Sequence, residues 1–282
     1  MSYFLKEIND DYKGILQGDV FKVGSSCGDI FGPLEDFAVV ITADCDIVNK
    51  KMGDYFTILP MISTESYLKE IWLKKIISDE KKSYIHKIVE HMNKAPNFKA
   101  LECNDMSVCE LEDWMSSETI ELILAQLNIE ISTGKNGIKD TIDKYNETLK
   151  VNCIRTFVLY RKYLGKPNSK IDKEIKEAIQ KNMRAEFQFI PDLGLSSETG
   201  MILKLRDIRA IHKNRVFIDG MELKTAQIDP NTCIERVGRF SDYLRYSITQ
   251  NFASLFSRIG MPKTFEDDMD ASLSLITESI VE

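Results

Sequence analysis

Histidine is scarce in this sequence, and its cysteines lack the spacing of metal ligands. Its 282 residues include only three histidines, and none of its six cysteines form a C-x-x-C pair. His86 and His91 lie five residues apart, whereas two histidines that share a metal on one helical face lie four apart. We therefore expect no metal and no cofactor, and we expect most cysteines to be free thiols that pack as small apolar residues.

Two further absences restrict the class of protein. No apolar run reaches the ~18 residues that a membrane-spanning helix needs, and the N-terminus lacks the ordered regions of a signal peptide. These features predict a cytoplasmic protein without a membrane partner. Basic residues are also fewer than acidic ones: the sequence has 37 lysines and arginines and 44 aspartates and glutamates, for a formal net charge of −7. This balance argues against a large nucleic-acid-binding face, while a small basic patch is compatible with it.

What the sequence does contain is a hydrophobic period that changes twice. Residues 15–62 hold short apolar runs between glycines, which is typical of strands. Residues 66–183 have apolar residues at helical spacing, including a stripe over 138–164 that predicts one long helix. After residue 184 the pattern predicts short strands and then an amphipathic helix. These are expected at 187–190, 201–205, 208–211 and 216–218, with the helix at about 240–260.

The changes of period predict an α+β fold. We expect a β-rich domain formed by residues 1–62 and 184–262, a helical insertion over 63–183, and an acidic tail over 263–282. Neither strand set is large enough to close a barrel alone, so we expect both to join in one domain closed by the C-terminal helix. A chain of three independent modules is the alternative.

The most informative segment is an apolar strand that runs into Asp44-Cys45-Asp46. If the strand continues, alternation places Cys45 in the core and turns Thr42 and the two aspartates toward a sheet margin. The aspartates would then be acid–base residues, metal ligands or acceptors for an arginine. The alternative is that Asp46 and Asn49 only cap the turn through bonds to nearby backbone N–H groups. Cys45 as a nucleophile would need a neighbouring base, and the sequence places no histidine beside it.

Four short motifs occur together in residues 16–62. They are Gly18-Asp19-Val20, Ala38-Val-Val-Ile-Thr42, the turn from Asp46 to Asn49, and the strand end Ile58-Leu59-Pro60. This combination resembles the N-terminal half of the MazF/PemK-type toxins, which have a small SH3-like β-barrel and typically cleave single-stranded RNA. The resemblance implies an SH3-like barrel for the interrupted domain, with Thr42 at the position of the family's serine or threonine.

One departure from that family concerns its cleavage site. Its members usually carry an Arg-Pro just before the valine-rich strand, and that arginine belongs to the cleavage site. Here the segment reads Gly32-Pro-Leu-Glu-Asp-Phe37, with acids where the base should be. An acidic residue repels phosphate, so the departure argues against ribonuclease chemistry. The segment from Arg239 to Pro262 also resembles the ends of uncharacterised bacterial proteins found among phage-defence and toxin–antitoxin-like genes.

Arginines in the second half of the chain suggest two roles. Arg206 and Arg209, with Lys204, Lys213 and Arg215 nearby, form the densest basic run of the second strand set. This run would either meet phosphate or an acidic partner, or lie as ordinary cations on an outer strand face. Arg239 and Arg245 flank the start of the C-terminal helix. If that helix packs along the barrel, one of them can bind an aspartate of the Asp44–Asp46 motif, because two neighbouring carboxylates need a cation and an arginine can form two parallel bonds. We predict that such a pair closes the interrupted domain.

These observations support hypotheses from different functional classes. The leading one is a non-catalytic partner-binding or regulatory component of a bacterial conflict system, of the phage-defence or toxin–antitoxin kind, with a protein partner encoded in the same gene neighbourhood. The alternative is a MazF-like RNA endonuclease in which Arg206 or Arg209 replaces the missing cation, and Thr42 with Asp44 supplies polar contacts. A Cys45-dependent hydrolase is the third.

Overall fold

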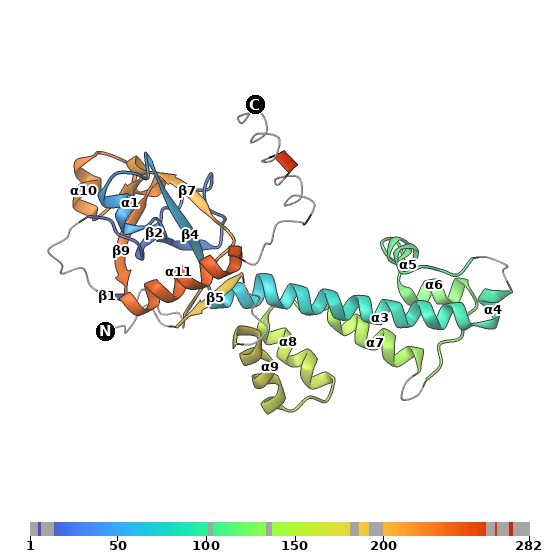
Figure 1. The fold of residues 1–282 in the computed structure, drawn as a ribbon. Helices are drawn as coiled ribbons and strands as arrows, with labels where there is room; N and C mark the ends of the chain where they lie inside the picture. The colour runs from blue at the N-terminus through green and yellow to red at the C-terminus, as the bar shows by residue number, and fades with distance from the viewer. Residues whose placement is uncertain are drawn as a thin grey trace. The chain divides into compact units, whose positions relative to one another are not determined.

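The computed structural model describes residues 5–6, 14–100, 104–133, 137–180, 186–191, 200–257, 263 and 271–272. The chain divides into two compact units. Residues 1–63 and 183–282 form one, called here the strand-rich unit, and residues 64–182 form the other, called the helical unit. The protein is therefore of the α+β class (Figure 1).

Strands of the first unit form one sheet. Within the described residues they are β1 (Leu5–Lys6), β2 (Asp19–Val23), β3 (Glu35–Val40), β4 (Tyr55–Ser63), β5 (Phe187–Ile190), β6 (Met201–Lys204), β7 (Arg209–His212), β8 (Val216–Phe217) and β9 (Ile234–Phe240). The helices of the unit are α1 (Asp44–Val48), α10 (Gly220–Thr225) and α11 (Asp242–Ser257), with 3-10 turns at Lys213–Arg215 and Pro230–Thr232. The four strands predicted between 187 and 218 and the helix after residue 240 are thus present.

The sheet order is β1-β9-β2-β3-β4-β6-β5, with β7 also paired to β4 and β8 also paired to β9. Only the pairing of β8 with β9 is parallel among the described strands, and the sheet is mixed and open. β4 joins the two strand sets, because Tyr55–Ile58 pairs with β7 and Met61–Ser63 pairs with β6. Both sets therefore belong to one sheet, as the sequence predicts.

Both faces of this sheet are buried. Val39 and Leu59 belong to one apolar cluster, whereas their neighbours Val40 and Ile58 belong to a second cluster on the other face. Helix α11 lies along the first face (Figure 1) and packs three apolar side chains onto it, Leu244, Ile248 and Leu255. Burial on both faces explains why the strands have continuous apolar runs in place of a polar alternation.

The strand before the aspartate motif ends earlier than predicted. β3 ends at Val40, and α1 begins where the backbone N–H groups of Asp46 and Ile47 donate to the Ala43 carbonyl at 3.0 and 3.1 Å. Acidic residues in a first turn are favoured by the positive end of a helix. The predicted strand alternation through Asp46 is therefore wrong, and Cys45 is exposed where a core position was expected.

Helices make up the second unit. They are α2 (Thr64–Ser66), the π-helical segment η1 (Tyr67–Leu73), α3 (Lys74–Lys94), α4 (Pro96–Lys99), α5 (Val108–Met115), α6 (Ile120–Gln126), α7 (Ile138–Leu149), α8 (Ile154–Tyr163) and α9 (Asn168–Gln180). An apolar cluster joins α3 to α5, α6 and α7 through residues such as Ile88, Leu111, Ile123 and Ile142. In Figure 1, α7 lies along α3. No described helix is both long and apolar enough to cross a membrane.

The single long helix predicted over 138–164 is wrong. The chain leaves α7 at Leu149, whose side chain is exposed, and starts α8 at Ile154. The Thr156 hydroxyl accepts the backbone N–H groups of Asn152 and Cys153 at 3.0 and 3.1 Å, which caps the new helix. Of the predicted acidic tail, only residues 263, 271 and 272 are among those described.

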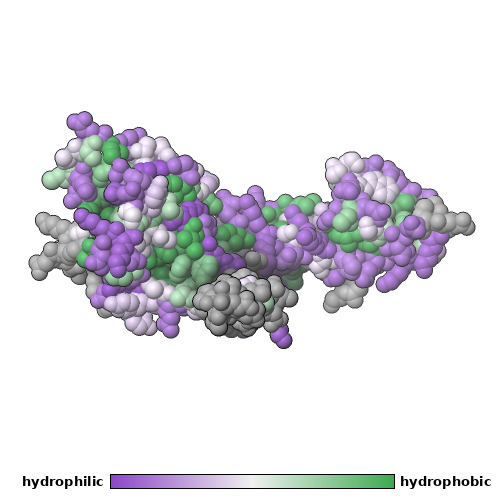
Figure 2. All heavy atoms as spheres, turned by 45° about the horizontal axis from the view of Figure 1, so that its top comes forward, coloured by the Kyte–Doolittle hydropathy of each residue, from purple (hydrophilic) through white to green (hydrophobic). Residues whose placement is uncertain are grey.

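Hydrophilic residues cover much of the surface in Figure 2, with apolar residues showing as patches between them.

Candidate functional site

The first predicted aspartate lies where three segments of the strand-rich unit meet. Asp44 Oδ2 is 2.9 Å from Nη1 of Arg245 on α11, and Asp44 Oδ1 accepts the backbone N–H of Gln17 at 2.7 Å. The adjacent Gly18 has φ +85°, and a Cβ added there would lie 2.9 Å from Arg245 Cδ. Glycine is therefore required for both the backbone conformation and the close approach. The Asp44–Arg245 pair holds the turn before β2, α1 and α11 together.

The other two members of the motif take no part in this pair. The Cys45 thiol is exposed and lies 3.6 Å from Asp46 Oδ1. A nucleophilic cysteine needs a base nearby. His212, the histidine of this unit, instead accepts the backbone N–H of Asn214 at 3.3 Å and packs edge-on against Tyr55. Among the described residues, the geometry thus gives Cys45 no histidine partner for the hydrolase hypothesis, and its thiol contacts only the Asp46 carboxylate.

Arg239, the second arginine expected to pair with the motif, binds a different carboxylate. Its Nε and Nη2 donate to Asp19 at 2.5 and 3.3 Å, and Arg236 Nη1 donates to the same group at 3.2 Å. The Leu16 backbone N–H adds a bond of 3.0 Å to Asp19. Asp19 is completely buried and Arg239 is 6% exposed, so this is a buried ion pair. The sequence marked Asp19 only as part of a motif and did not assign it this partner.

Arg209, a candidate phosphate ligand, is occupied by carboxylates. Its Nη1 and Nη2 lie 2.6 and 2.9 Å from the two oxygens of Glu35, and its Nε and Nη2 lie 2.8 and 2.5 Å from Asp207. Lys204 contacts both acids as well, with Nζ 2.6 Å from Glu35 Oε1. Glu35 belongs to the acidic segment noted before the valine-rich strand. That segment therefore neutralises Arg209, one of the two cations that the nuclease hypothesis could use.

The remaining candidates are separate from this network. The Thr42 hydroxyl accepts the backbone N–H of Thr57 at 2.7 Å and is nearly buried. The Arg206 side chain is 62% exposed, and its Nε lies 3.8 Å from a carboxylate oxygen of Glu186. The structure therefore brings Asp44 and Arg245 together but keeps Arg206 and Arg209 in other clusters.

Glu35 supplies a testable pH dependence. Burial acts to raise its pKa, but hydrogen bonds from Lys204, the Gly32 N–H and Arg209 outweigh burial, and the net pKa is lowered. A carboxylate with a lowered pKa in the folded state stabilises the fold above its unfolded pKa, roughly 4.3 for glutamate, and this stability is lost as the pH falls through the folded value. We expect the difference in unfolding free energy between wild type and Glu35→Gln to shrink as the pH drops from 6 to 3.

Urea titrations followed by circular dichroism at several pH values measure this difference. The neighbouring exposed residue provides a control, because Asp36→Asn should leave the acid dependence of stability as in the wild type. A Glu35→Gln variant whose stability deficit is the same at pH 6 and pH 3 would show that the network does not depend on the Glu35 charge.

A second buried network lies in the helical unit and was not predicted. The Arg161 guanidinium is 2.6 Å from Glu80 through Nη1 and 2.6 Å from Glu174 through Nη2, and its side chain is only 3% exposed. It also lies 4.6 Å from the Phe157 ring centroid. Tyr160 donates its hydroxyl to Glu80 at 2.6 Å. These contacts tie α8 and α9 to α3. The one sequence cue was a charged residue within an otherwise apolar helical stripe.

The described residues contain no group of three or more histidine, cysteine or carboxylate side chains placed to hold a metal ion. The cysteines Cys27, Cys45, Cys109, Cys153 and Cys233 are free, but only Cys27 and Cys233 are buried as the sequence led us to expect; Cys103 lies outside the described residues. No family model, curated protein or solved structure that was compared matches the chain.

Proposed function

We propose that the strand-rich unit is an SH3-like barrel of the MazF type put to non-catalytic use, as the partner-binding part of a regulatory protein in a bacterial conflict system. The motifs of residues 16–62 and the joining of both strand sets under α11 support the fold assignment. The observation that carries partner binding is the exposure of two tyrosines on α11. Tyr243 is 84% exposed and Tyr246 is 60% exposed, although the opposite side of the helix is buried.

These tyrosines lie on the helix that carries the Asp44–Arg245 pair, and Tyr243, Tyr246, Arg245, Asp44 and Val48 are called here the α11 surface. The Tyr246 hydroxyl accepts from Arg245 Nη2 at 3.1 Å, and the guanidinium carbon lies 4.9 Å from the Tyr246 ring centroid. Val48 is 57% exposed one helical turn beyond Asp44. Tyrosine and arginine are enriched at the centres of protein interfaces, so this composition supports a protein partner.

Charge indicates which kind of protein would bind. The sequence of the strand-rich unit holds 25 acidic and 17 basic residues, whereas that of the helical unit holds 19 acidic and 20 basic residues. This excess of acidic residues lies outside the described part of the unit, so the local charges decide. The side chains of Asp44 and Asp242 are 38% and 63% exposed, whereas that of Arg245 is 12% exposed. A partner with basic residues around an apolar anchor is complementary to this surface.

The test is affinity capture with tagged protein from the native host, using matched variants. We expect the wild type to retain one stoichiometric, basic protein and Tyr243→Ala/Tyr246→Ala to lose at least ten-fold of it, because aromatic side chains supply much of the binding energy at such sites. Tyr55→Ala is the control, since Tyr55 is 54% exposed on β4. The captured amount should also fall as salt rises.

Three results would contradict the proposal. They are the absence of a stoichiometric partner, equal capture by the double variant and the wild type, and a captured species that proves to be a second copy of this chain.

The RNA-cleavage hypothesis has less support from the same contacts. Arg209 already faces two carboxylates, and the Thr42 hydroxyl is bonded to the backbone of β4. Arg206 is the exposed cation that such an enzyme could use. If the protein is a nuclease, its expression in a bacterium should arrest growth and cleave transcripts, and Arg206→Ala should abolish both effects.

A further inference from the structure

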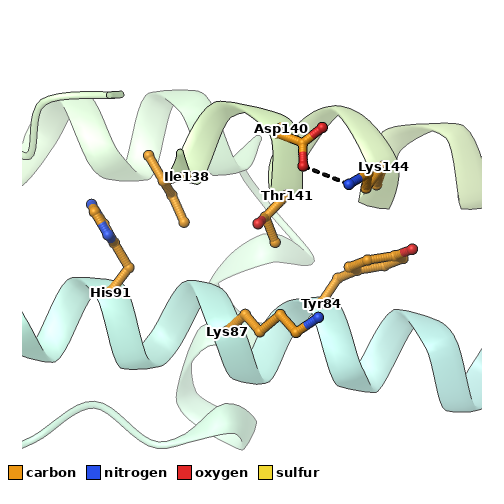
Figure 3. A pocket seen from close by; sticks show the side chains of 7 residues that line it. All are labelled: Tyr84, Lys87, His91, Ile138, Asp140, Thr141 and Lys144. Carbon is orange, nitrogen blue, oxygen red and sulfur yellow. Dashed lines mark hydrogen bonds and ion pairs between the residues drawn. The ribbon is translucent and has the colours of Figure 1, made fainter. Parts of the chain in front are cut away.

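A cavity of about 350 Å³ lies between α3 and α7, within the helical unit (Figure 3). Its polar lining residues are Tyr84, Lys87 and His91 from α3 and Asp140, Thr141 and Lys144 from α7. In Figure 3 the Thr141 side chain points from α7 into the space between the helices. The volume falls at the small end of the range of ligand-binding cavities, roughly 300–1,000 Å³.

Two lysines and one aspartate line the cavity, so one lysine has no carboxylate partner within the lining. Lys144 Nζ is 2.5 Å from Asp140 Oδ2, and this hydrogen bond raises the pKa of Lys144. Lys87 lies 5.6 Å from the Tyr84 ring centroid, and no described carboxylate pairs with it. The lining therefore has a net positive charge even with His91 neutral, which favours an anionic ligand.

The hydrogen bonds of Tyr160, next to the cavity, determine which atom is the donor between the Tyr84 and Tyr160 hydroxyl groups. Tyr160 gives its only hydroxyl hydrogen to Glu80, at 2.6 Å. Burial and the bond to Glu80 raise the pKa of Tyr160 strongly, so the hydroxyl stays protonated. The Tyr84 hydroxyl lies 3.0 Å from that of Tyr160, and with the Tyr160 hydrogen already used, Tyr84 must be the donor. The Tyr84 oxygen is left as an acceptor beside the cavity.

We propose that this cavity binds a phosphate monoester that also carries a hydroxyl group, the chemistry of a sugar phosphate. Lys87 and Lys144 face the phosphate, and the Thr141 hydroxyl donates to one of its oxygens. The Tyr84 oxygen accepts the hydroxyl of the ligand. Asp140 opposes binding through its negative charge, and its pairing with Lys144 limits that opposition. This site belongs to the helical unit and does not depend on the partner-binding function proposed for the strand-rich unit.

Calorimetric titration of the full chain with ribose 5-phosphate, inorganic phosphate and ribose tests the proposal. Saturable binding is expected for ribose 5-phosphate, weaker binding for inorganic phosphate, and none for ribose. Lys87→Gln should weaken ribose 5-phosphate binding at least ten-fold. Lys82→Gln, an exposed lysine on α3 outside the cavity lining, should not. Tyr84→Phe should remove the preference for the sugar phosphate over inorganic phosphate.

Asp140→Asn separates a binding site from a merely structural ion pair. Removal of the carboxylate frees Lys144 and removes repulsion, so ribose 5-phosphate should bind several-fold more tightly, whereas a purely structural role predicts unchanged or weaker binding. The proposal is overturned if no phosphate ligand saturates the wild type, or if Lys87→Gln and Lys82→Gln behave alike. Equal affinities for inorganic phosphate and ribose 5-phosphate would overturn the role of the Tyr84 oxygen.

Discussion

Asp19→Asn is expected to destabilise the strand-rich unit by about 3–5 kcal/mol, the cost of removing one partner from a buried ion pair. The Asp19 carboxylate is completely buried and accepts bonds from Arg239 and Arg236. Asparagine has nearly the same volume and can still accept a bond from the Leu16 N–H, but it removes the negative charge. Two guanidinium groups of low exposure then lose this carboxylate, and water cannot replace it there.

Urea unfolding followed by circular dichroism, with hydrogen exchange of β2 and β9 as a local readout, measures the loss. Two variants of the predicted motif serve as controls. Arg245→Gln should cost only about 1 kcal/mol, because the Asp44 side chain is 38% exposed and the pair is screened by solvent. Asp46→Asn should change stability by less than about 0.5 kcal/mol. A smaller loss for Asp19→Asn than for Arg245→Gln would mean that the contact closing this unit is at Asp44.

Arg161→Met is expected to destabilise the helical unit by about 3 kcal/mol. Methionine keeps an apolar stem of similar length but removes the cation between Glu80 and Glu174, two carboxylates that then repel one another. Because both carboxylates are partly exposed, the expected loss lies at the low end of the values for buried pairs. The contact with the Phe157 ring is also lost.

Tryptophan fluorescence reports this unit selectively. Both tryptophans of the chain, Trp72 and Trp114, belong to the helical unit, and the Trp72 ring packs edge-on against Phe157 with centroids 5.1 Å apart. Arg155→Met, an exposed arginine on the same helix, should change the urea midpoint little. If Arg161→Met and Arg155→Met unfold at the same urea concentration, the buried network contributes no net stability.

The spacing of apolar residues was sufficient to predict a helix or strand wherever one side of that element is apolar at a regular interval. The strands between 187 and 218 and the helix α11 were predictable for this reason, since a stripe such as Leu244, Ile248 and Leu255 needs only its own spacing to be recognised. β9 was missed. Its sequence Ile-Glu-Arg-Val-Gly-Arg-Phe has charged residues at positions that a strand with a buried face would normally keep apolar.

Those charged positions make sense only with their distant partners. Arg239 follows Asp19 by 220 residues, and Arg209 follows Glu35 by 174 residues. Sequence spacing cannot reveal which carboxylate an arginine will meet across such intervals. The prediction that an arginine of the C-terminal segment meets the aspartate motif depended on guessing where α11 packs. That guess was sufficient for Arg245 with Asp44, whereas Arg239 binds Asp19.

The sequence by itself determined the α+β composition, the order of strands, helices and strands, and the residues near which the hydrophobic period changes. These properties follow from side-chain periodicity over a few turns or a few strand residues, which is a local quantity. The tertiary structure alone decided that the chain turns into α1 at Asp44, that Glu35 neutralises Arg209, and that Arg161 lies between two glutamates. Each of these depends on which charged groups are brought within about 3 Å when distant segments bury their apolar faces. The hydrophobic effect that drives this burial is non-directional, so the apolar pattern of the sequence cannot specify which charged groups will pair.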